Sequence, residues 1–426
     1  MTGIEYDDFL DLGYEPTATD LVCEFYVEPA DGMAIEDAAS RVASESSNGT
    51  WAALDVDADV SRLSAMAFEI TDTVPRRHEA SEASLVRVAY PEELFEFANM
   101  PQILSCIAGN ILGMKAVDRI RLDDCEWPEP LATSFRGPQF GTAVKSKLLD
   151  AGDRPVLATV PKPKVGLPTS VHAEVGYEAW MGGLDLLKDD ENLTDQSFND
   201  FEDRVVESFA ARDRAEEETG ETKEYLVNVT AESDEMLRRA EFVHEHGGSF
   251  VMVDVITAGW AGVQTVRNFC EQKGMAIHAH RAMHAAMDRV PSHGVSMRAL
   301  AQFSRLVGVD HIHTGTAGLG KLENEDTLGI NEWLQSDLYG LNPVLPTASG
   351  GLHPGLVPQL IEAIGAEICI QAGGGVHGHP DGTRAGAKAF RAATEAAVDG
   401  VSLKEKAAEA PELEQALETW GTDTPR

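Results

Sequence analysis

Short apolar runs, each ending in polar or glycine-rich residues, recur along the chain from about residue 155 onward. Eight such runs cover residues 155–163, 184–190, 224–230, 250–255, 276–281, 311–316, 344–351 and 368–375. Runs of this length, bounded by turn signals, are typical of buried strands. The stretches between them, such as FNDFEDRVVESFAARDRAEEE and SDEMLRRAEFVHEH, carry apolar residues at helical spacing and predict helices.

Eight strands that alternate with helices predict an α/β fold, because parallel strands need crossovers of about this length. We expect a closed (β/α)8 TIM barrel. The main alternative is an open doubly wound sheet, whose elements alternate in the same way. The count of eight units, and the absence of a GxGxxG string after the first strand, favour the barrel.

The first part of the chain has a different pattern. It holds strand candidates in LVCEFYVEP, SLVRVAY and KAVDRIRLDD, and a helix candidate in IEDAASRVASESS. We therefore predict a smaller α+β domain over residues 1–138 and the barrel over residues 139–426, with closing helices in the last fifty residues.

Acidic residues outnumber basic ones 71 to 34, which gives a formal net charge of −37. So much negative charge argues against binding to nucleic acid or to an anionic membrane. Because the acidity is spread along the chain, we expect a protein of a high-salt organism, where self-repulsion is screened. An ordinary acidic surface is the alternative.

The cysteines and the N-terminal sequence indicate a compartment. The five cysteines are widely separated and form no CxxC pair, which predicts reduced thiols. MTGIEYDDFLDLGYEP lacks the basic and apolar regions of a signal peptide, and no apolar run approaches the length of a membrane span. These features predict a cytoplasmic protein.

The string GTAGLGKL at residues 315–322 nearly matches the phosphate-loop pattern GxxxxGK[ST]. Leu322 occupies the hydroxyl position that would bind Mg²⁺, and the following ENEDTLG is too acidic for a helix that faces phosphate. We therefore interpret the string as a glycine loop that presents Lys321 at the carboxyl end of the sixth barrel strand, the face where barrel active sites lie.

Polar residues end the second predicted barrel strand. In GGLDLLKDDEN, Lys188 and Asp190 are two residues apart and share a direction, and Glu191 follows at the turn. Two carboxylates suit Mg²⁺, whereas a cationic lysine beside the metal would be repelled. Carbamylation of Lys188 by CO2 would turn that cation into an anionic oxygen ligand. The alternative is an exposed charged turn that caps the next helix.

Further basic residues gather at other strand ends. Lys162 and Lys164 lie two apart in VPKPKVGL, where prolines stiffen the chain. His280 and Arg281 close the fifth strand, and the pair His311 and His313 shares one face of the sixth. A lone lysine turn or core histidine would be unremarkable, but their concentration at these strand ends favours a site.

Glycines end the last two strands. Ser349, Gly350 and Gly351 follow the seventh, and residues 373–375 are all glycine at the end of the eighth. Such ends let backbone N–H groups reach an anion, and barrels commonly bind phosphate there. With Arg281 and His313 across the mouth, two phosphate sites flank the predicted metal, which indicates a sugar bisphosphate.

These residues resemble ribulose-1,5-bisphosphate carboxylase/oxygenase, Rubisco. The matching strings, in the family's order, are KPKVGL, GGLDLLKDDEN, HAHRAMH, DHIHTGT, GKLE, ASGG and QAGGGVHGHPDG, with ESSNGTW and GNILGMKA in the N-terminal part. The resemblance covers residues 20–390 or so. The acidic composition and the short C-terminal end are similar to the archaeal form III group, which lacks small subunits.

The resemblance implies a role for each candidate residue. Lys188 is similar to the carbamylated lysine that binds Mg²⁺ with Asp190 and Glu191, Lys162 to the general acid helped by Lys164, His280 to a positioning or proton-relay residue, and Lys321 to the loop lysine. Arg281, His313 and Ser349 resemble the grip on one phosphate and nearby hydroxyls, and Thr50, Trp51, Gly351, Gly373 and Gly374 the grip on the other. Gly350 is a further substrate-binding residue.

The implied activity is the carboxylation of ribulose 1,5-bisphosphate to two 3-phosphoglycerates, with competing oxygenation by O2. The cofactors implied are Mg²⁺ and an activating CO2 held as the carbamate. In the family Glu45, Thr50, Trp51 and Asn110 reach the partner's active site, which implies a homodimer with shared sites, without a small subunit. Form III members are associated with salvage of nucleoside-derived ribose phosphates.

Two other functions remain open from the sequence. One is a Rubisco-like enolase or isomerase, which keeps the metal site but does not carboxylate. Such relatives replace several of the phosphate-gripping and loop residues that this chain retains. The other is a non-catalytic acidic scaffold, which offers no reason for so many polar groups at the strand ends.

Overall fold

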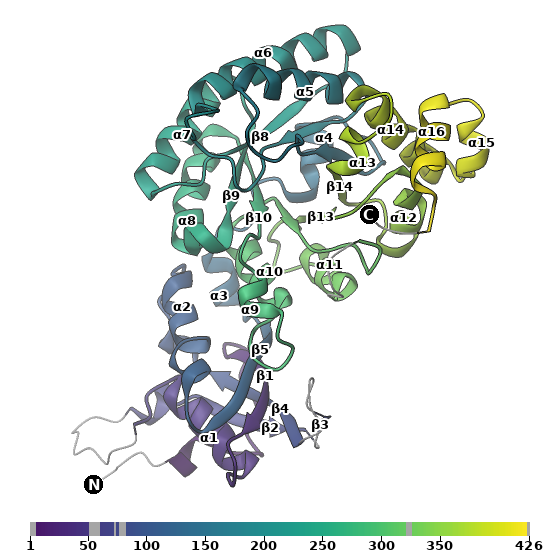
Figure 1. Ribbon diagram of the computed structural model, residues 1–426. Helices are drawn as coiled ribbons and strands as arrows, with labels where there is room; N and C mark the ends of the chain where they lie inside the picture. Colours follow the sequence, from purple (N-terminus) through teal and green to yellow (C-terminus); the bar gives the residue numbers. More distant parts are fainter. Residues whose placement is uncertain (1–5, 51–59, 72–73, 76–81, 321–325, 424–426) are drawn as a thin grey trace. The chain divides into compact units, whose positions relative to one another are not determined.

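The structure is a computed structural model that describes residues 6–50, 60–71, 74–75, 82–320 and 326–423 (Figure 1). The chain divides into two compact units. The first comprises Met1–Arg136, Met283–Leu306 and Leu338–Leu341, and the second comprises Gly137–Ala282, Val307–Asp337 and Asn342–Arg426. The units thus interleave in sequence, and the cut after residue 138 stays a prediction about separable domains.

The first unit is built on one mixed sheet. Its strands are β1 (Leu21–Pro29), β2 (Met66–Ile70), β3 (Val74–Pro75), β4 (Glu82–Tyr90), β5 (Val117–Glu126) and β11 (Gly294–Val295), and the order is β11-β5-β1-β4-β2, with β3 on β4. Strands β1 to β5 pair antiparallel, while β11 pairs parallel to β5. The helices α1 (Ile35–Glu45), α2 (Met100–Ile107), α3 (Glu129–Ser134), α9 (Ala285–Asp288) and most of α10 (Met297–Val307) also belong to this unit.

The second unit is a closed parallel barrel, as the sequence predicts. Its strands are β6 (Val156–Thr159), β7 (Leu186–Lys188), β8 (Glu224–Asn228), β9 (Phe250–Asp254), β10 (Ala276–His280), β12 (His311–His313), β13 (Leu345–Ser349) and β14 (Cys369–Ala372). They close in the order β10-β12-β13-β14-β6-β7-β8-β9. Each strand lies inside one of the eight predicted runs, so the (β/α)8 prediction is confirmed and the open doubly wound sheet is wrong.

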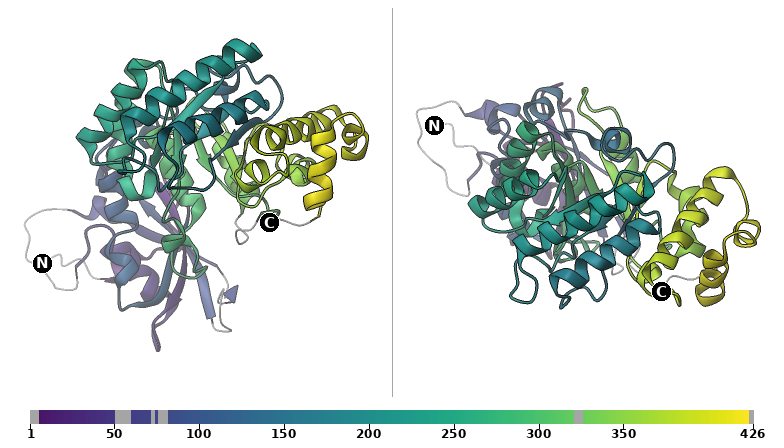
Figure 2. Two further views of the ribbon diagram at one scale, coloured as in Figure 1. Left: turned by 45° about the horizontal axis from the view of Figure 1, so that its top comes forward. Right: turned by 90° about the horizontal axis from the view of Figure 1, so that it is seen from above.

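Helices surround the strands of this barrel (Figure 2). They include α4 (Val144–Lys147), α5 (Thr169–Met181), α6 (Phe201–Thr219), α7 (Ser233–Glu245), α8 (Val255–Lys273), α11 (Thr327–Gln335), α12 (Val357–Ile364) and α13 (Gly374–His377). The closing helices α14 (Thr383–Asp399), α15 (Leu403–Ala407) and α16 (Pro411–Trp420) pack together and carry the yellow end of the colour scale.

The barrel interior is filled rather than open. Apolar side chains from seven of its strands, among them Leu186, Leu226, Phe250 and Met252, form one buried cluster. Such a packed core leaves chemistry to the carboxyl ends of the strands. Those ends here are polar: Lys188, Asn228, Asp254, His280, His313 and Ser349 are each the last residue of a strand.

Candidate active site

Lys188 lies at the end of β7 and is completely buried. Its ammonium Nζ donates a hydrogen bond of 2.6 Å to the backbone carbonyl of Asp189. Burial lowers the pKa of Lys188, although the carboxylates of Glu191 and Asp190 oppose the shift. A lysine with a lowered pKa is more often a neutral amine, which is the form that can add to CO2.

The two predicted lysines of the first strand end each reach one of the predicted carboxylates. The Nζ of Lys162 lies 3.4 Å from Oδ2 of Asp190, and the Nζ of Lys164 lies 3.7 Å from Oε1 of Glu191. Asp190 is buried, whereas Lys164 is exposed. Burial also lowers the pKa of Lys162, against the charge of Asp190. The structure thus brings the first two strand ends together around these two carboxylates.

Gly373 provides room for Lys162. A Cβ atom at Gly373 would lie 2.7 Å from Cε of Lys162, closer than real Cβ contacts come. The glycine after the eighth strand therefore leaves space for the lysine that follows the neighbouring first strand.

His280 connects the carboxylates to the next strands. Its Nε2 lies 3.6 Å from Oε2 of Glu191, and its Nδ1 lies 3.4 Å from Oδ1 of Asp254. Burial lowers the pKa of His280 to about 4, and the positive charge of Lys188 adds to this shift. The imidazole is therefore neutral near pH 7 and can accept a proton or a hydrogen bond.

On the far side of the mouth, the Nδ1 of His313 lies 2.7 Å from the hydroxyl of Ser349. The ring of His313 also packs against that of His280, with 4.9 Å between centroids. Arg281 follows β10 and is buried. His311, the other histidine of β12, is buried in the barrel core rather than at the mouth, and it contacts the ring of Phe250.

The glycine-rich ends of β13 and β14 line one cavity of about 250 Å³. Gly351 and Gly373–Gly375 lie along it with Leu352, His353 and Trp420. Gly350 and Gly351 have φ angles of 111° and 76°, the left-handed region that favours glycine. This cavity is where the sequence predicts one of the anion sites, and Trp420 is a lining residue that the sequence analysis missed.

The N-terminal candidates lie in the other unit. The Nδ2 of Asn110 donates to Oε1 of Glu45 at 3.3 Å, and both side chains are exposed. They line a hollow of about 850 Å³ together with Arg41 and Lys115. Thr50 is half-buried, and Trp51 lies outside the described residues.

Lys321 also lies outside the described residues, although the loop before it is described. A Cβ atom at Gly320 would lie 2.4 Å both from the carbonyl oxygen of Gly350 and from Oγ1 of Thr316. The residue before the lysine therefore rests against the end of the seventh strand, at the mouth of the barrel.

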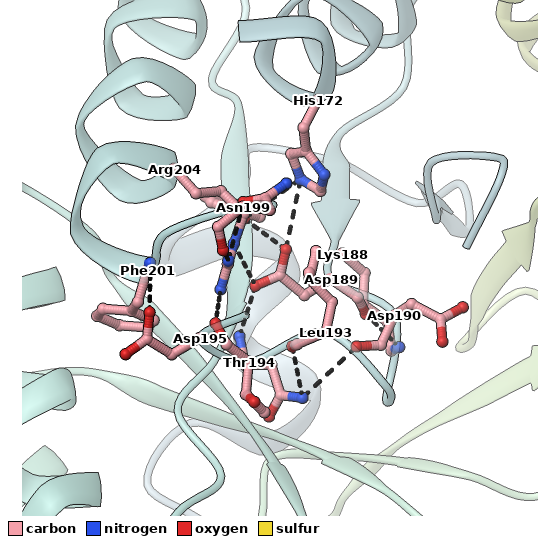
Figure 3. A network of polar contacts seen from close by, with 12 residues as sticks. His172, Lys188, Asp189, Asp190, Leu193, Thr194, Asp195, Asn199, Phe201 and Arg204 are labelled. Atoms are coloured by element: carbon pink, nitrogen blue, oxygen red, sulfur yellow. Dashed lines mark hydrogen bonds and ion pairs between the residues drawn. The ribbon is translucent and has the colours of Figure 1, made fainter. Parts of the chain in front are cut away.

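A buried ionic network supports the turn that carries the carboxylates (Figure 3). Oδ2 of Asp189 accepts from the backbone N–H of Asn228 at 2.9 Å and lies 3.4 Å from Nε of Arg204, while Oδ1 accepts from the hydroxyl of Tyr225. Burial by itself would raise the pKa of Asp189, but the Arg204 charge and contact with His172 outweigh it and lower the pKa to about 2.

The same network extends along the loop that follows. The guanidinium of Arg204 donates to the side chain of Asn199 and to the carbonyl of Thr194, and the amide of Asn228 donates to the carbonyl of Leu193. Asp189, Asn228 and Asp254 were missed in the sequence analysis. A polar residue that closes an apolar run, as in FVMVDV, is the signal that would have pointed to Asp254.

The donor set fits Mg²⁺. Among the described residues, no group of three or more His, Cys, Asp or Glu side chains could hold a metal ion, so the two carboxylates need a further ligand. Asp190 and Glu191 supply two hard oxygen ligands, and the adjacent Lys188 would supply a third once it carries CO2. Each of the two carboxylates lies beside a lysine ammonium in the structure, so each already has a cation as its partner.

Comparison with known proteins decides the family. Residues 141–420 match the family model of the ribulose bisphosphate carboxylase large chain, catalytic domain, and residues 8–131 match that of its N-terminal domain. This chain belongs to the Rubisco large-chain family. The resemblance found in the sequence is therefore confirmed.

Archaeal Rubisco proteins are similar over nearly the whole chain. The ribulose bisphosphate carboxylase of Pyrococcus abyssi is 50% identical, with 99% of this chain and 98% of that protein covered. That of Methanosarcina mazei is 45% identical, with 97% and 99% covered. These relatives fit the archaeal form III type, while a high-salt origin stays a prediction.

Two solved Rubisco structures match the fold closely. The octameric Rubisco of Pyrococcus horikoshii, crystallised as a sulfate complex, gives a TM-score of 0.94 at 48% identity, with 99% of this chain and 98% of that one covered. A dimeric archaeal Rubisco from Hyperthermus butylicus gives a TM-score of 0.91 at 44% identity, with 98% of this chain and 99% of that one covered.

Throughout the described ranges of this chain, no helix has the length and apolar character needed to cross a bilayer.

Proposed function

We propose that this Rubisco-family enzyme carboxylates ribulose 1,5-bisphosphate, and oxygenates it in competition, in an active site at the carboxyl ends of the barrel strands. The observation that supports this most is the pairing of Lys162 with Asp190 and of Lys164 with Glu191 beside the buried Lys188. The proposed proton donor, Lys162, then lies next to Asp190, one of the proposed metal ligands.

Lys188, Asp190 and Glu191 hold the metal in this proposal. Bound Mg²⁺ would polarise the carbonyl and hydroxyl oxygens at C2 and C3 of the sugar. A carbamate on Lys188 would supply the base for the C3 proton. Lys188 is buried, which keeps water away from this base. The hydrogen bonds of Asp189 hold the turn that follows Lys188 in place.

The remaining residues bind and protonate. Lys321 would offset the negative charge of the new carboxylate at C2, and Lys162 would protonate the carbanion left when water addition at C3 leads to C2–C3 cleavage. His280 positions Glu191 and relays a proton. Lys164 raises the acidity of Lys162 by its charge.

The two phosphates occupy opposite sides of the mouth. Arg281, His313 and Ser349 bind one of them and nearby hydroxyls, and Gly350 is a further substrate-binding residue. Gly351, Gly373 and Gly374 bind the other in the glycine-lined cavity, together with Thr50 and Trp51 of a partner subunit. Glu45 and Asn110, like Thr50 and Trp51, reach the active site of the other subunit, so the functional unit is a homodimer. Among solved relatives, one Rubisco is described as octameric and another as dimeric.

The experiment that tests the proposal follows 3-phosphoglycerate formation from ribulose 1,5-bisphosphate, after incubation of the enzyme with or without CO2 and Mg²⁺. We expect activity to rise after the incubation, because Lys188 must first carry CO2. Full activity of enzyme kept free of CO2, in an assay of the C3 proton exchange alone, would contradict the role of the carbamate. Supply of the substrate by ribose-phosphate salvage belongs to the proposal and is tested by loss of growth on nucleosides when the gene is deleted.

A further inference from the structure

A chain of hydrogen-bonding atoms runs from the mouth of the barrel into its core. The hydroxyl of Ser349 lies 2.7 Å from Nδ1 of His313, and Nε2 of His313 lies 3.0 Å from Nε2 of His278. Nδ1 of His278 in turn lies 3.4 Å from Nδ1 of His311. All three imidazoles are buried, with at most 2% of each exposed.

The chain ends at His311. Within the described part of the chain, its Nε2 has no hydrogen-bond partner, and its ring lies 5.6 Å from that of Phe250. The rings of His278 and its two neighbours stand nearly perpendicular, at 84° and 90°. A ring nitrogen thus faces a ring nitrogen at both contacts between histidines, and Ser349 is the end of this row at the mouth of the barrel.

Neutral imidazole carries one N–H donor and one nitrogen lone pair. Where two ring nitrogens face each other, one must donate and the other must accept, so neighbouring rings fix each other's tautomer. Only two proton arrangements satisfy every contact. Either His311 donates to His278, His278 to His313 and His313 to Ser349, or each of these hydrogen bonds runs in the opposite direction.

A charged ring would remove this constraint. An imidazolium at His278 would donate to both neighbours, so a single direction of hydrogen bonding would no longer set the tautomers of His311 and His313. Burial lowers the pKa of all three rings, that of His311 to about 3. The chain consequently holds no extra proton near pH 7, and its end at His311 offers no outlet for one. It transmits the direction of hydrogen bonding, without moving net charge.

We propose that His278 and His311 are positioning residues that fix the tautomer of His313 and thereby set whether the Ser349 hydroxyl donates to, or accepts from, the ligand in the mouth. When the ligand presents an anionic oxygen, Ser349 must donate, so His313 donates to Ser349 through Nδ1. His278 then carries its proton on Nε2, and His311 carries its proton on Nδ1. The ligand's chemistry rests on the proposed function; the coupling of the tautomers does not.

The coupling is tested by ¹⁵N NMR of the imidazoles in the full-length protein labelled at histidine, because the shifts of the two ring nitrogens report the tautomer. Signals are assigned with the single variants His278→Leu, His311→Leu and His313→Leu. We expect three neutral rings between pH 6 and pH 8, with alternating tautomers. Saturating inorganic phosphate should leave the protons on Nδ1 of His311, Nε2 of His278 and Nδ1 of His313. Equal tautomers on neighbouring rings, an imidazolium, or the reversed arrangement with phosphate would overturn the proposal.

A second experiment separates positioning from packing. In His311→Leu we expect the KM for ribulose 1,5-bisphosphate to rise about fivefold, the value of roughly one neutral hydrogen bond, with kcat within twofold of the parent. The tautomer of His313 should become mixed. His311→Gln, which can donate and accept, should restore both readings, and His246→Gln on the exposed end of α7 should change neither. A folded His311→Leu protein with the parent KM and an unmixed His313 would overturn the assignment.

The two proposals fail separately. If the tautomers alternate and respond to phosphate while ribulose 1,5-bisphosphate gives no product, the proposed function is wrong and the coupling stands. If product forms but neighbouring tautomers are independent, the coupling is wrong and the proposed function stands.

Discussion

Lys188 and Lys145 are both buried lysines, but they have different partners. Lys145, on α4, forms an ion pair with Glu367 away from the strand ends, while Lys188 lies beside the two carboxylates of the predicted metal site. Replacing each lysine in turn therefore separates an effect on catalysis from an effect on stability.

We expect Lys188→Met to abolish carboxylation, with at least about a thousandfold loss of kcat, because the carbamate cannot form. The melting temperature should stay or rise, since a methionine of similar shape needs no solvation. Lys145→Met is the matched control: it should keep kcat and change the melting temperature little, because the exposed carboxylate of Glu367 stays solvated without its partner. Steady-state kinetics and thermal unfolding of both variants measure this, and residual turnover in Lys188→Met would contradict the role of the lysine.

Glu224 gives stability a pH dependence. Burial raises its pKa from 4.5 to about 7, despite the nearby charge of Arg212. The folded state therefore holds the proton more tightly than the unfolded state, so this group's stabilising contribution is complete below about pH 4.5 and is lost as the pH rises through 7.

Glu224→Gln should therefore raise the free energy of unfolding at pH 8 by on the order of 2 kcal/mol, and change it little at pH 4. Urea unfolding at the two pH values measures this. A gain at pH 4 that equals the gain at pH 8 would show that the carboxyl of Glu224 is not the cause.

Site residues could be predicted from the sequence where several polar residues follow one another at the end of a strand. Lys188, Asp190 and Glu191 are adjacent, and the structure brings them to Lys162 and Lys164 as expected. Asp254 and His278 were not recognised, because a single polar residue in an apolar strand has the same pattern whether it faces the mouth or lies in the core.

At the scale of elements, the loop from Asp189 to Asn199 owes its shape to buried charge. Asp189 and Arg204 are both completely buried and depend on each other. A short apolar run predicts the strand β7, and apolar residues at helical spacing predict the helix α6. The pairing of Asp189 with Arg204 arises only when the fold brings together residues that are fifteen positions apart.

Asp189→Asn should lower the free energy of unfolding by about 3–5 kcal/mol, because Arg204 is left as a buried charge without its counterion. Asp200→Asn is the matched control on the same loop. Asp200 caps α6 by accepting from the backbone N–H groups of Glu202 and Asp203, and asparagine caps equally well, so that change should stay within about 0.5 kcal/mol. Equal effects of the two variants in urea unfolding would contradict the special position of Asp189.

At the scale of the whole molecule, the barrel could be predicted because its eight strands repeat one pattern. The interleaving of the units could not. β11 has only two residues, Gly294 and Val295, and it joins the sheet of the first unit although it follows the fifth barrel strand in sequence. A two-residue strand has no periodicity, and its partner β5 lies far away along the chain.

The proposed shared site makes a prediction for mixed dimers. Lys188→Met and Asn110→Ala should each lose activity alone, but co-expressed chains should recover about one quarter of the parent activity. Half of the dimers are then mixed, and each mixed dimer holds one site in which Lys188 and the partner's Asn110 are both intact. Recovery no greater than that of either variant alone would mean that each site is built from one chain.

The most direct test of the central claim combines two readings in one sample. The enzyme, activated with CO2 and Mg²⁺, receives ribulose 1,5-bisphosphate, isotope-labelled bicarbonate and deuterated water at molar salt. The account predicts label in the carboxylate of 3-phosphoglycerate, formed at a rate that falls to background in Lys188→Met. Deuterium entering C3 of the recovered substrate, with no label in phosphoglycerate, would contradict it and leave a barrel that enolises without fixing carbon.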